Sequence, residues 1–241
     1  MSNETSLHRR RRPARTDELD AIPWLAVLDA RQRERVSLEI QVSDAQPGDF
    51  VCRTARPVTY WFGVIDGLLK MSSDNAEGQT MTYTGIPPGG WFGEGTALKR
   101  EPYRYNIQAL RNSIVAGLPV DSFHWLLDHS IGFNRFVMNQ INERLGQFIA
   151  AREIDRMTNP DVRVARSLAA LFNPVLYPGV GEVLRITQQE LAYLVGLSRQ
   201  RVNEALRALQ ARQVIRVEYG GLRVLSLDAL RSRIFPNPVS T

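Results

Sequence analysis

A group of polar side chains in the C-terminal third of this 241-residue chain has the chemistry needed to read base pairs. The group consists of Arg199, Gln200, Arg201, Asn203 and Glu204. Arginine can bond to guanine, glutamine to adenine, and glutamate can accept a hydrogen bond from cytosine. On a helix whose first turns enter the major groove, these side chains would face the base edges. We therefore expect Arg199, Gln200 and Glu204 to read bases and Arg201 to serve the DNA backbone.

The residues on either side of this group supply the helices needed to position it. Thr187 followed by Glu190 has capping-box spacing and predicts the start of a first helix. Gly196 provides a turn, and Ser198 can cap a second helix. Residues 187–210 thus predict a helix-turn-helix, in which Thr187 and Ser198 belong to the DNA-contacting set. The alternative is a plain helical hairpin with a solvated polar face.

Two β-rich runs, 213–218 and 222–226, follow the second helix and flank a Tyr-Gly-Gly turn at 219–221. This pattern predicts a tight hairpin, which beside a recognition helix would form a wing. Arg216 and Arg223 could contact phosphates from it. The charge agrees with this prediction. Residues 159–241 carry 11 arginines against 6 acidic residues, within a formal net charge of +5 for the chain.

The N-terminal residues and the cysteine content argue against a secreted, disulfide-bonded protein. Cys52 is the single cysteine, which excludes an intramolecular disulfide framework and suits a reducing cytoplasm. Residues 1–20 have no apolar run of the kind a secretory signal needs, and we expect a disordered basic tail there. Arg9 to Arg12 could touch DNA or stay solvated. No stretch approaches the ~20 apolar residues of a membrane span, so a cytoplasmic protein without membrane contact is expected.

The residue pattern of 21–130 is typical of a β domain. A short amphipathic helix is predicted from Pro23, and strand-like runs punctuated by glycine and proline are predicted from about Val36. Such short, closely spaced strands suggest a small barrel or jelly roll that can enclose a ligand.

A long helical run follows, from about residue 121 to 157. Met138, Ile141, Leu145 and Phe148 recur at 3–4 spacing and form one apolar stripe. The stripe could pair with a second copy of the chain or pack on the barrel, and we favour the homodimer. Two recognition helices about 34 Å apart would then read a roughly palindromic site on double-stranded DNA.

This order of elements resembles the Crp/Fnr family of transcription regulators over about residues 22–230. Residues 186–209 with the wing behind them, and the glycine-glutamate loop at 89–95 (GGWFGEG), carry the resemblance. Residues 161–170 are similar to the helix that follows the family's hinge. The resemblance implies an α+β fold: a disordered tail (1–20), a β-barrel or jelly roll of cyclic-nucleotide-binding type (21–130), a dimerisation helix and hinge (131–158), and a winged helix-turn-helix (159–241). It also implies RNA polymerase as a partner.

The family's cyclic-nucleotide members hold the ribose with a loop glutamate and the phosphate with an arginine beside a serine or threonine. Glu94, next to Gly93, matches the glutamate; it either contacts a ligand or merely caps the loop. The family's spacing from the glutamate places the phosphate arginine at Arg104. Its spacing from the alanine of the next strand, here Ala109, places Tyr103 at that position instead. No serine or threonine adjoins Arg104, which argues against cyclic AMP. A cyclic nucleotide or another small effector remains the expected ligand, if the barrel has kept one.

Other kinds of site have little support in the sequence. His124 and His129 are five residues apart and do not share a helix face as paired metal ligands do, so no metal is expected. No phosphate loop, nucleophile elbow or paired-histidine motif points to an enzyme. The expected function is a homodimeric, sequence-specific DNA-binding transcription regulator. The alternative is a cyclic-nucleotide-binding signalling module whose C-terminal domain contacts protein instead of DNA.

Overall fold

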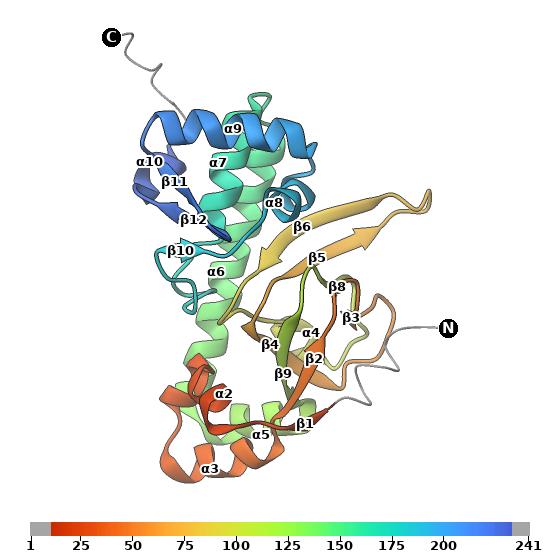
Figure 1. Cartoon of the computed structure of the whole chain (residues 1–241). Helices are drawn as coiled ribbons and strands as arrows, with labels where there is room; N and C mark the ends of the chain where they lie inside the picture. The colour runs from red at the N-terminus through yellow and green to blue at the C-terminus, as the bar shows by residue number, and fades with distance from the viewer. Residues whose placement is uncertain (1–10, 233–241) are drawn as a thin grey trace. The chain divides into compact units, whose positions relative to one another are not determined.

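The computed structural model describes residues 11–232, and the chain divides into two compact units (Figure 1). The N-terminal unit takes in Met1–Leu145 and Pro174–Gly179. The C-terminal unit takes in Gly146–Asn173 and Val180–Thr241. Helix α6 (Ile131–Asp155) contributes residues to both units. Within residues 11–232, no helix is long and apolar enough to cross a bilayer.

Two antiparallel sheets form the β part of the N-terminal unit (Figure 1). The five-stranded sheet has the order β1 (Arg12–Pro13), β2 (Gln41–Ala45), β9 (Ser113–Pro119), β4 (Tyr60–Asp66) and β7 (Trp91–Phe92). The four-stranded sheet has the order β3 (Phe50–Cys52), β8 (Asn106–Ala109), β5 (Leu69–Asp74) and β6 (Thr80–Ile86). Strands far apart in sequence are therefore neighbours, as in a jelly roll. The α+β class with an N-terminal β domain is confirmed.

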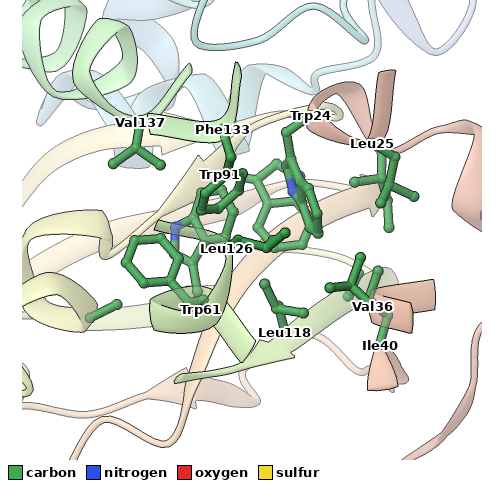
Figure 2. Packing of buried hydrophobic residues seen from close by; sticks show 14 of the residues in the cluster. Trp24, Leu25, Val36, Ile40, Trp61, Trp91, Leu118, Leu126, Phe133 and Val137 are labelled. Carbon is green, nitrogen blue, oxygen red and sulfur yellow. The ribbon is translucent and has the colours of Figure 1, made fainter. Parts of the chain in front are cut away.

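An aromatic cluster fills the core of this unit (Figure 2). Trp24, Trp61, Trp91, Phe123 and Phe133 are all buried. The ring centroids of Trp61 and Trp91 lie 4.4 Å apart, and those of Trp24 and Trp91 lie 5.2 Å apart. Tilted and edge-on pairs of this kind are favourable because the positive edge of one ring meets the negative face of another.

The expectation of a disordered tail is wrong for residues 11–20. Strand β1 pairs antiparallel with β2, and helix α2 (Thr16–Asp20) follows it. Arg12 forms an ion pair with the buried carboxylate of Glu18, with Nη2 and Oε1 2.5 Å apart. The guanidinium of Arg11 lies 3.9 Å from the ring centroid of Tyr60. Arg9 and Arg10 lie outside the described residues. The composition of this segment predicts a tail because the strand that holds Arg12 forms only against β2, and Tyr60, the partner of Arg11, lies on β4.

The next segment is more helical than its composition indicates. Pro23–Val27 forms a 3-10 helix, η1, and Ala30–Glu39 forms helix α3. The expected strand texture from Val36 is therefore wrong as far as residue 40, because Val36 is a buried helical residue. Asp29 explains the helix start, since its side chain accepts from the Gln32 backbone N–H at 2.8 Å.

The long helical run predicted from residue 121 is divided into two helices. Helix α5 (Val120–His129) ends at Ser130, and α6 begins at Ile131. The Ser130 hydroxyl accepts a hydrogen bond from the Phe133 backbone N–H, which favours a new helix start there. Gly132 permits close packing, because a Cβ at that position would lie 2.5 Å from the Val27 carbonyl oxygen. Helix α4 (Glu94–Lys99) is short and precedes β8.

The C-terminal unit contains the predicted helix-turn-helix and wing (Figure 1). Its helices are α7 (Pro160–Ala170), α8 (Gln188–Val195), α9 (Arg199–Ala211) and α10 (Leu227–Arg231). The hairpin β11 (Ile215–Glu218) and β12 (Gly221–Val224) gains a third strand, β10 (Val183–Leu184), on the β12 side. Helix α7 packs against α8, α9 and α10.

Candidate nucleic-acid interface and effector site

The predicted start of helix α8 is present as a reciprocal capping box. The Thr187 hydroxyl accepts from the Glu190 backbone N–H at 3.2 Å. The Glu190 carboxylate accepts in return from the Thr187 backbone N–H at 2.7 Å. These bonds satisfy two amides that the helix leaves free, so the sequence 187–190 fixes where α8 begins.

The turn into helix α9 also has the predicted geometry. Gly196 ends α8 with a φ of 69°, in the left-handed region that favours glycine. Ser198 begins α9, because its hydroxyl accepts from the Arg201 backbone N–H at 3.2 Å. Helices α8 and α9 face each other through buried apolar and small residues: Leu191, Ala192, Val195, Val202, Ala205 and Leu206. The polar side of α9 is therefore left at the surface.

On the polar side of α9, some side chains are exposed to solvent and others are held by ion pairs. Arg199 and Gln200 are exposed in the first turn. Arg201 is held by two carboxylates, with Nη2 2.8 Å from Asp161 and Nη1 2.7 Å from Glu204. The hydrogen bond to Glu204 raises the pKa of Arg201, and the same bond lowers the pKa of Glu204. Arg201 thus links α9 to α7 and orients Glu204.

Two amide side chains complete the ordered polar surface of α9. Gln200 donates to the second oxygen of Glu204 at 3.3 Å. Asn203 accepts from the side chain of Gln188, on α8, at 3.1 Å. The bonds around Glu204 and Asn203 hold these side chains in place, whereas the Arg199 side chain makes no hydrogen bond or ion pair within residues 11–232. Such a surface combines fixed acceptors with an arginine able to adapt to a ligand.

The wing is a tight hairpin in which Arg216 lies directly opposite Arg223. Arg216 is exposed. Arg223 bonds through Nε to Glu218 at 2.6 Å and through Nη1 to Glu182 at 2.6 Å. The hydrogen bond to Glu218 raises the pKa of Arg223. The two candidate phosphate contacts therefore differ, since one is free to meet a phosphate and the other is neutralised by its neighbours.

The candidate effector residues of the N-terminal unit do not meet in one site. Glu94 is 3% exposed and accepts from Arg144 Nε at 2.7 Å. Arg104 points outward, with its side chain 75% exposed and paired to Glu101 at 2.7 Å. Tyr103, which precedes Arg104 in the chain, is buried, and its hydroxyl donates to the Tyr60 carbonyl oxygen at 2.9 Å. No bond joins Glu94 to Arg104 among the described contacts.

Arg144 is the residue of this site that the sequence reasoning missed. It lies on α6, is 8% exposed, and also donates from Nη2 to the Trp91 carbonyl oxygen at 2.5 Å. Burial disfavours its charge, but the carboxylate of Glu94 raises the pKa of Arg144 above its usual value. The sequence signal is weak: Phe133 and Val137 mark an apolar helix face, and helical spacing continues it through Gln140 to Arg144, all four of which are buried in the structure. An arginine that continues such a face needs a buried acid as partner.

The histidines are engaged inside the N-terminal unit. His124 Nε2 lies 3.0 Å from the Ala97 carbonyl oxygen. His129 stacks on Trp125 and bonds to its carbonyl oxygen at 2.8 Å. No group of three or more histidine, cysteine or acidic residues placed to hold a metal occurs between residues 11 and 232.

The predicted apolar stripe lies along α6 and is largely uncovered. Met138 is 64% exposed, Leu145 59% and Ile141 37%. Phe148 is half-buried, and Ile149 extends the stripe by another turn at 60% exposure. Large apolar side chains repeated along one helix face at these exposures are typical of an interface.

Comparisons with known proteins agree with this architecture. The family model for the cyclic nucleotide-binding domain matches residues 43–130, and that for the Crp-like helix-turn-helix domain matches residues 162–233. A curated relative, the transcriptional regulator SdrP of Thermus thermophilus, is 28% identical over 174 residues, which cover 70% of this chain and 81% of that protein.

Solved structures share the fold. FixK2 from Bradyrhizobium japonicum matches with a TM-score of 0.65 at 14% identity, over 80% of this chain and 96% of that chain. A regulator from Xanthomonas campestris, the c-di-GMP-responsive CLP, matches with a TM-score of 0.56 at 20% identity, over 82% of this chain and 100% of that chain.

Proposed function

This chain belongs to the Crp/Fnr family of DNA-binding transcription regulators, and we propose that it reads a specific, roughly palindromic DNA site as a homodimer. The observation that carries the proposal is the exposed first turn of α9, which follows a properly capped α8 and a glycine turn. A helix so placed can enter the major groove with its N-terminal residues toward the bases.

Three side chains of α9 are proposed to read bases. Arg199 is exposed and would donate two hydrogen bonds to guanine. Gln200 would pair with adenine. Glu204 would accept from cytosine, with its carboxylate oriented by Arg201. Arg201 then acts by holding Glu204 and α7 in place, in addition to any contact with the DNA backbone.

Contacts to the DNA backbone would come from the ends of the helices and from the wing. Thr187, Ser198 and Asn203 lie on or beside the helix-turn-helix, where hydroxyl and amide groups can reach phosphates. Arg216 is the exposed arginine of the wing and the better placed phosphate ligand. Arg223 would first have to leave Glu218 and Glu182, so we assign it the smaller share of binding energy.

The apolar stripe of α6 supports the homodimer part of the proposal. Burying Met138, Leu145 and Ile149 against a second copy would remove large apolar side chains from water. A two-fold dimer would place the recognition helices about 34 Å apart, one turn of duplex. At a promoter, RNA polymerase is the proposed further partner, by membership in the family. We propose a regulatory and not an enzymatic role.

The N-terminal unit carries a cyclic nucleotide-binding domain, so a small effector belongs to the proposal. Gly93 and Glu94 lie where that ligand would be expected, but Arg104 is exposed and paired with Glu101. Cyclic AMP bound through both Glu94 and Arg104 would therefore need both residues to give up their present partners.

Selection from random-sequence DNA, followed by gel shift with the selected site, tests the proposal. Arg199→Ala should weaken binding by about 1–3 kcal/mol and relax the preference at one base pair of each half-site. Arg31→Ala is the charge-matched control, because Arg31 is an exposed arginine of α3 in the other unit. If no motif is selected and Arg199→Ala binds DNA as the unmodified chain does, the alternative of a protein-contacting C-terminal domain is preferred.

A further inference from the structure

A chain of ion pairs and hydrogen bonds runs from the first turn of α7 to the exposed face of α9. Its members, in spatial order, are Asp161, Arg201, Glu204 and Gln200. We propose that Asp161 positions Glu204 through Arg201 and thereby sets how strictly the protein reads the base pair that Glu204 contacts. This role rests on the proposed DNA-reading function and adds to it a residue from outside the helix-turn-helix. Asp161 is a positioning residue, because it acts on Arg201 and not on a base.

Arg201 is held between two carboxylates. Its Nη2 lies 2.8 Å from Asp161 Oδ1, and its Nη1 lies 2.7 Å from Glu204 Oε2. The side chain of Asp161 is 24% exposed and that of Arg201 is 35% exposed, so this pair is partly shielded from water and salt. Charge-assisted hydrogen bonds of this length are stronger than bonds between neutral groups. Arg201 cannot turn its terminal nitrogens toward a phosphate or a guanine without leaving a carboxylate.

The surroundings of Asp161 make it a fixed point. Asn159 caps α7, and its side-chain oxygen accepts from the Asp161 backbone N–H at 2.9 Å. Arg163, two residues further on, donates to the Val195 carbonyl oxygen at 3.2 Å, where α8 ends. Helix α7 also packs against α8 and α9 (Figure 1). The first turn of α7 is therefore attached to both helices of the motif, and Asp161 holds Arg201 from a well-anchored position.

The orientation of Glu204 follows from the position of Arg201. One carboxylate oxygen of Glu204 accepts from Arg201 at 2.7 Å, and the other accepts from Gln200 at 3.3 Å. A carboxylate has about four lone-pair positions, so its oxygens can still accept a bond from a cytosine amino group. A side chain that is ordered before binding loses less conformational entropy when it meets the base. The ion pair with Arg201 therefore favours one orientation of Glu204 and sharpens its choice of base.

Release of Arg201 would have the opposite effect on recognition. A free guanidinium presents its N–H donors in a planar fork that suits a phosphate. Phosphate contacts add affinity on any sequence and carry no base preference. Asp161 thus withholds one cation from the DNA backbone and uses it to orient a base-reading carboxylate. The result is weaker binding to unrelated DNA and better discrimination at one base pair.

A general effect of Asp161 on its own helix has to be separated from this role. An acidic residue in the first turn of a helix interacts favourably with the helix N-terminus, whatever lies beside it. Asp228 offers a matched control, since it takes the same second position in α10 that Asp161 takes in α7. Asp228 is exposed and belongs to the same unit. Asp228→Ala therefore removes an equal charge from a helix start and leaves Arg201 with both of its carboxylates.

The test uses the full chain and selection from random-sequence DNA, followed by gel shift over a series of salt concentrations. The variants are Asp161→Ala, Asp161→Asn, the same two changes at Asp228, Arg201→Leu, and Arg201→Leu combined with Asp161→Ala. Glu204→Ala identifies the base pair that Glu204 reads, as the position at which preference disappears. Circular dichroism reports whether each variant keeps its helix content.

We expect the unmodified chain to discriminate roughly 5- to 150-fold against a substitution at that base pair, the usual cost of one mismatch. Asp161→Ala should bring this ratio toward 1 and leave the preference at the base pair read by Arg199 unchanged. Its affinity for unrelated DNA should rise, and the salt slope of log K should steepen by about 1, as one more phosphate is neutralised. Asp228→Ala should match the unmodified chain in motif and in salt slope.

The Arg201→Leu background shows whether Asp161 acts through Arg201. In that background, Asp161→Ala should change neither the motif nor the salt slope, because the residue that transmits its effect is gone. If Asp161→Ala alone loses helix content, the comparison of Asp161→Asn with Asp228→Asn decides. Asp161→Asn should show a smaller change of the same kind, because its amide oxygen can still accept from Arg201 but carries no charge.

Two results would overturn the role of Asp161. One is a folded Asp161→Ala that has the same motif, base preferences and salt slope as Asp228→Ala. The other is an effect of Asp161→Ala that persists in full in the Arg201→Leu background, which would make Asp161 a direct DNA contact or a helix-stabilising residue. Failure of the proposed function looks different: the unmodified chain would select no motif at all, and that result would remove the role of Asp161 with it.

Discussion

Replacing Gly63 by alanine would drive a methyl group into the tryptophan cluster of the N-terminal unit. Gly63 lies on β4, opposite Trp91 of β7. An added Cβ would lie 2.3 Å from Trp91 Cε2 and 2.5 Å from Cδ2, where ordinary contacts are 3.4–4 Å. Trp91 has little room to give way, because Trp61 and Trp24 pack against it with ring centroids 4.4 and 5.2 Å away.

The size of the effect follows from this overlap. Overpacking a well-packed core costs about 1–3 kcal/mol, occasionally more. Here the shortfall exceeds 1 Å and the obstacle is a rigid ring held on two sides, so we expect about 3 kcal/mol, at the upper end of that range. For a unit of this size, each kcal/mol lowers Tm by roughly 2–4 °C, giving a drop of about 6–12 °C.

Tryptophan fluorescence during urea unfolding is the suitable assay. All four tryptophans, Trp24, Trp61, Trp91 and Trp125, belong to the N-terminal unit, so their signal reports the unfolding of that unit. Gly95→Ala is the matched control, because nothing lies within 4 Å of an added Cβ at that helical position. It should leave stability unchanged or raise it by about 0.5–1 kcal/mol.

The packing argument would be refuted if Gly63→Ala unfolded at the same urea concentration as the unmodified chain or as Gly95→Ala. That outcome would mean that the ring of Trp91 can move by more than 1 Å at no cost. The cluster would then be loosely packed in solution, and it would not hold Trp91 in a fixed position for its hydrogen bond with Arg144.

Three further predictions concern charge and association. Arg12 lowers the pKa of Glu18, so the stabilisation that this pair gives near neutral pH should be lost as the pH falls through that lowered pKa. Glu18→Gln should reduce the free energy of unfolding by about 1.5–3 kcal/mol at pH 7. In urea unfolding at a series of pH values, its stability should then fall less steeply toward acid pH than that of the unmodified chain. An equally steep fall would contradict this. Arg216→Ala should weaken DNA binding evenly across sequences and reduce the salt slope of log K by about 1, whereas an unchanged slope would remove Arg216 from the phosphate contacts. Leu145→Glu should raise the dimer dissociation constant roughly tenfold or more in sedimentation, and an unaffected dimer would place the interface elsewhere.

The features that could be predicted from sequence are those set by neighbours a few residues apart. Thr187 and Glu190 cap the same helix start, Gly196 needs its own left-handed conformation, and the Tyr-Gly turn of the wing joins adjacent strands. Each of these is complete within about four residues, so residue type and spacing are sufficient evidence. The helix-turn-helix and the wing were found for this reason.

The features that could not be predicted depend on partners far along the chain. Glu94 and Arg144 are 50 residues apart, and β1 pairs with β2 across about 30 residues. Helical spacing places Arg144 on the same face of α6 as Phe133 and Val137, but only tertiary packing brings Glu94 to that face. The pairing of Arg144 with Glu94 could not be predicted for this reason.

Arg12 is a different case, because its partner Glu18 is six residues away, but the strand that holds Arg12 forms only against β2. Asp29 caps the helix that contains Val36 and lies close to it in sequence, so this helix had a local signal that the strand prediction overlooked.

The lengths of the outer strands indicate where this chain is vulnerable to aggregation. Strands β1, β7 and β3, which close three of the four sheet edges in the N-terminal unit, have only two or three residues each, and β1 includes a proline. Edges so short offer almost no row of free N–H and C=O groups to another chain. Strand β6 is different: it has seven residues, forms the outer side of a long hairpin, and exposes Met81 and Tyr83 (Figure 1). If the protein polymerises on storage or heating, strand addition should begin along β6, and a lysine at Met81 should delay it.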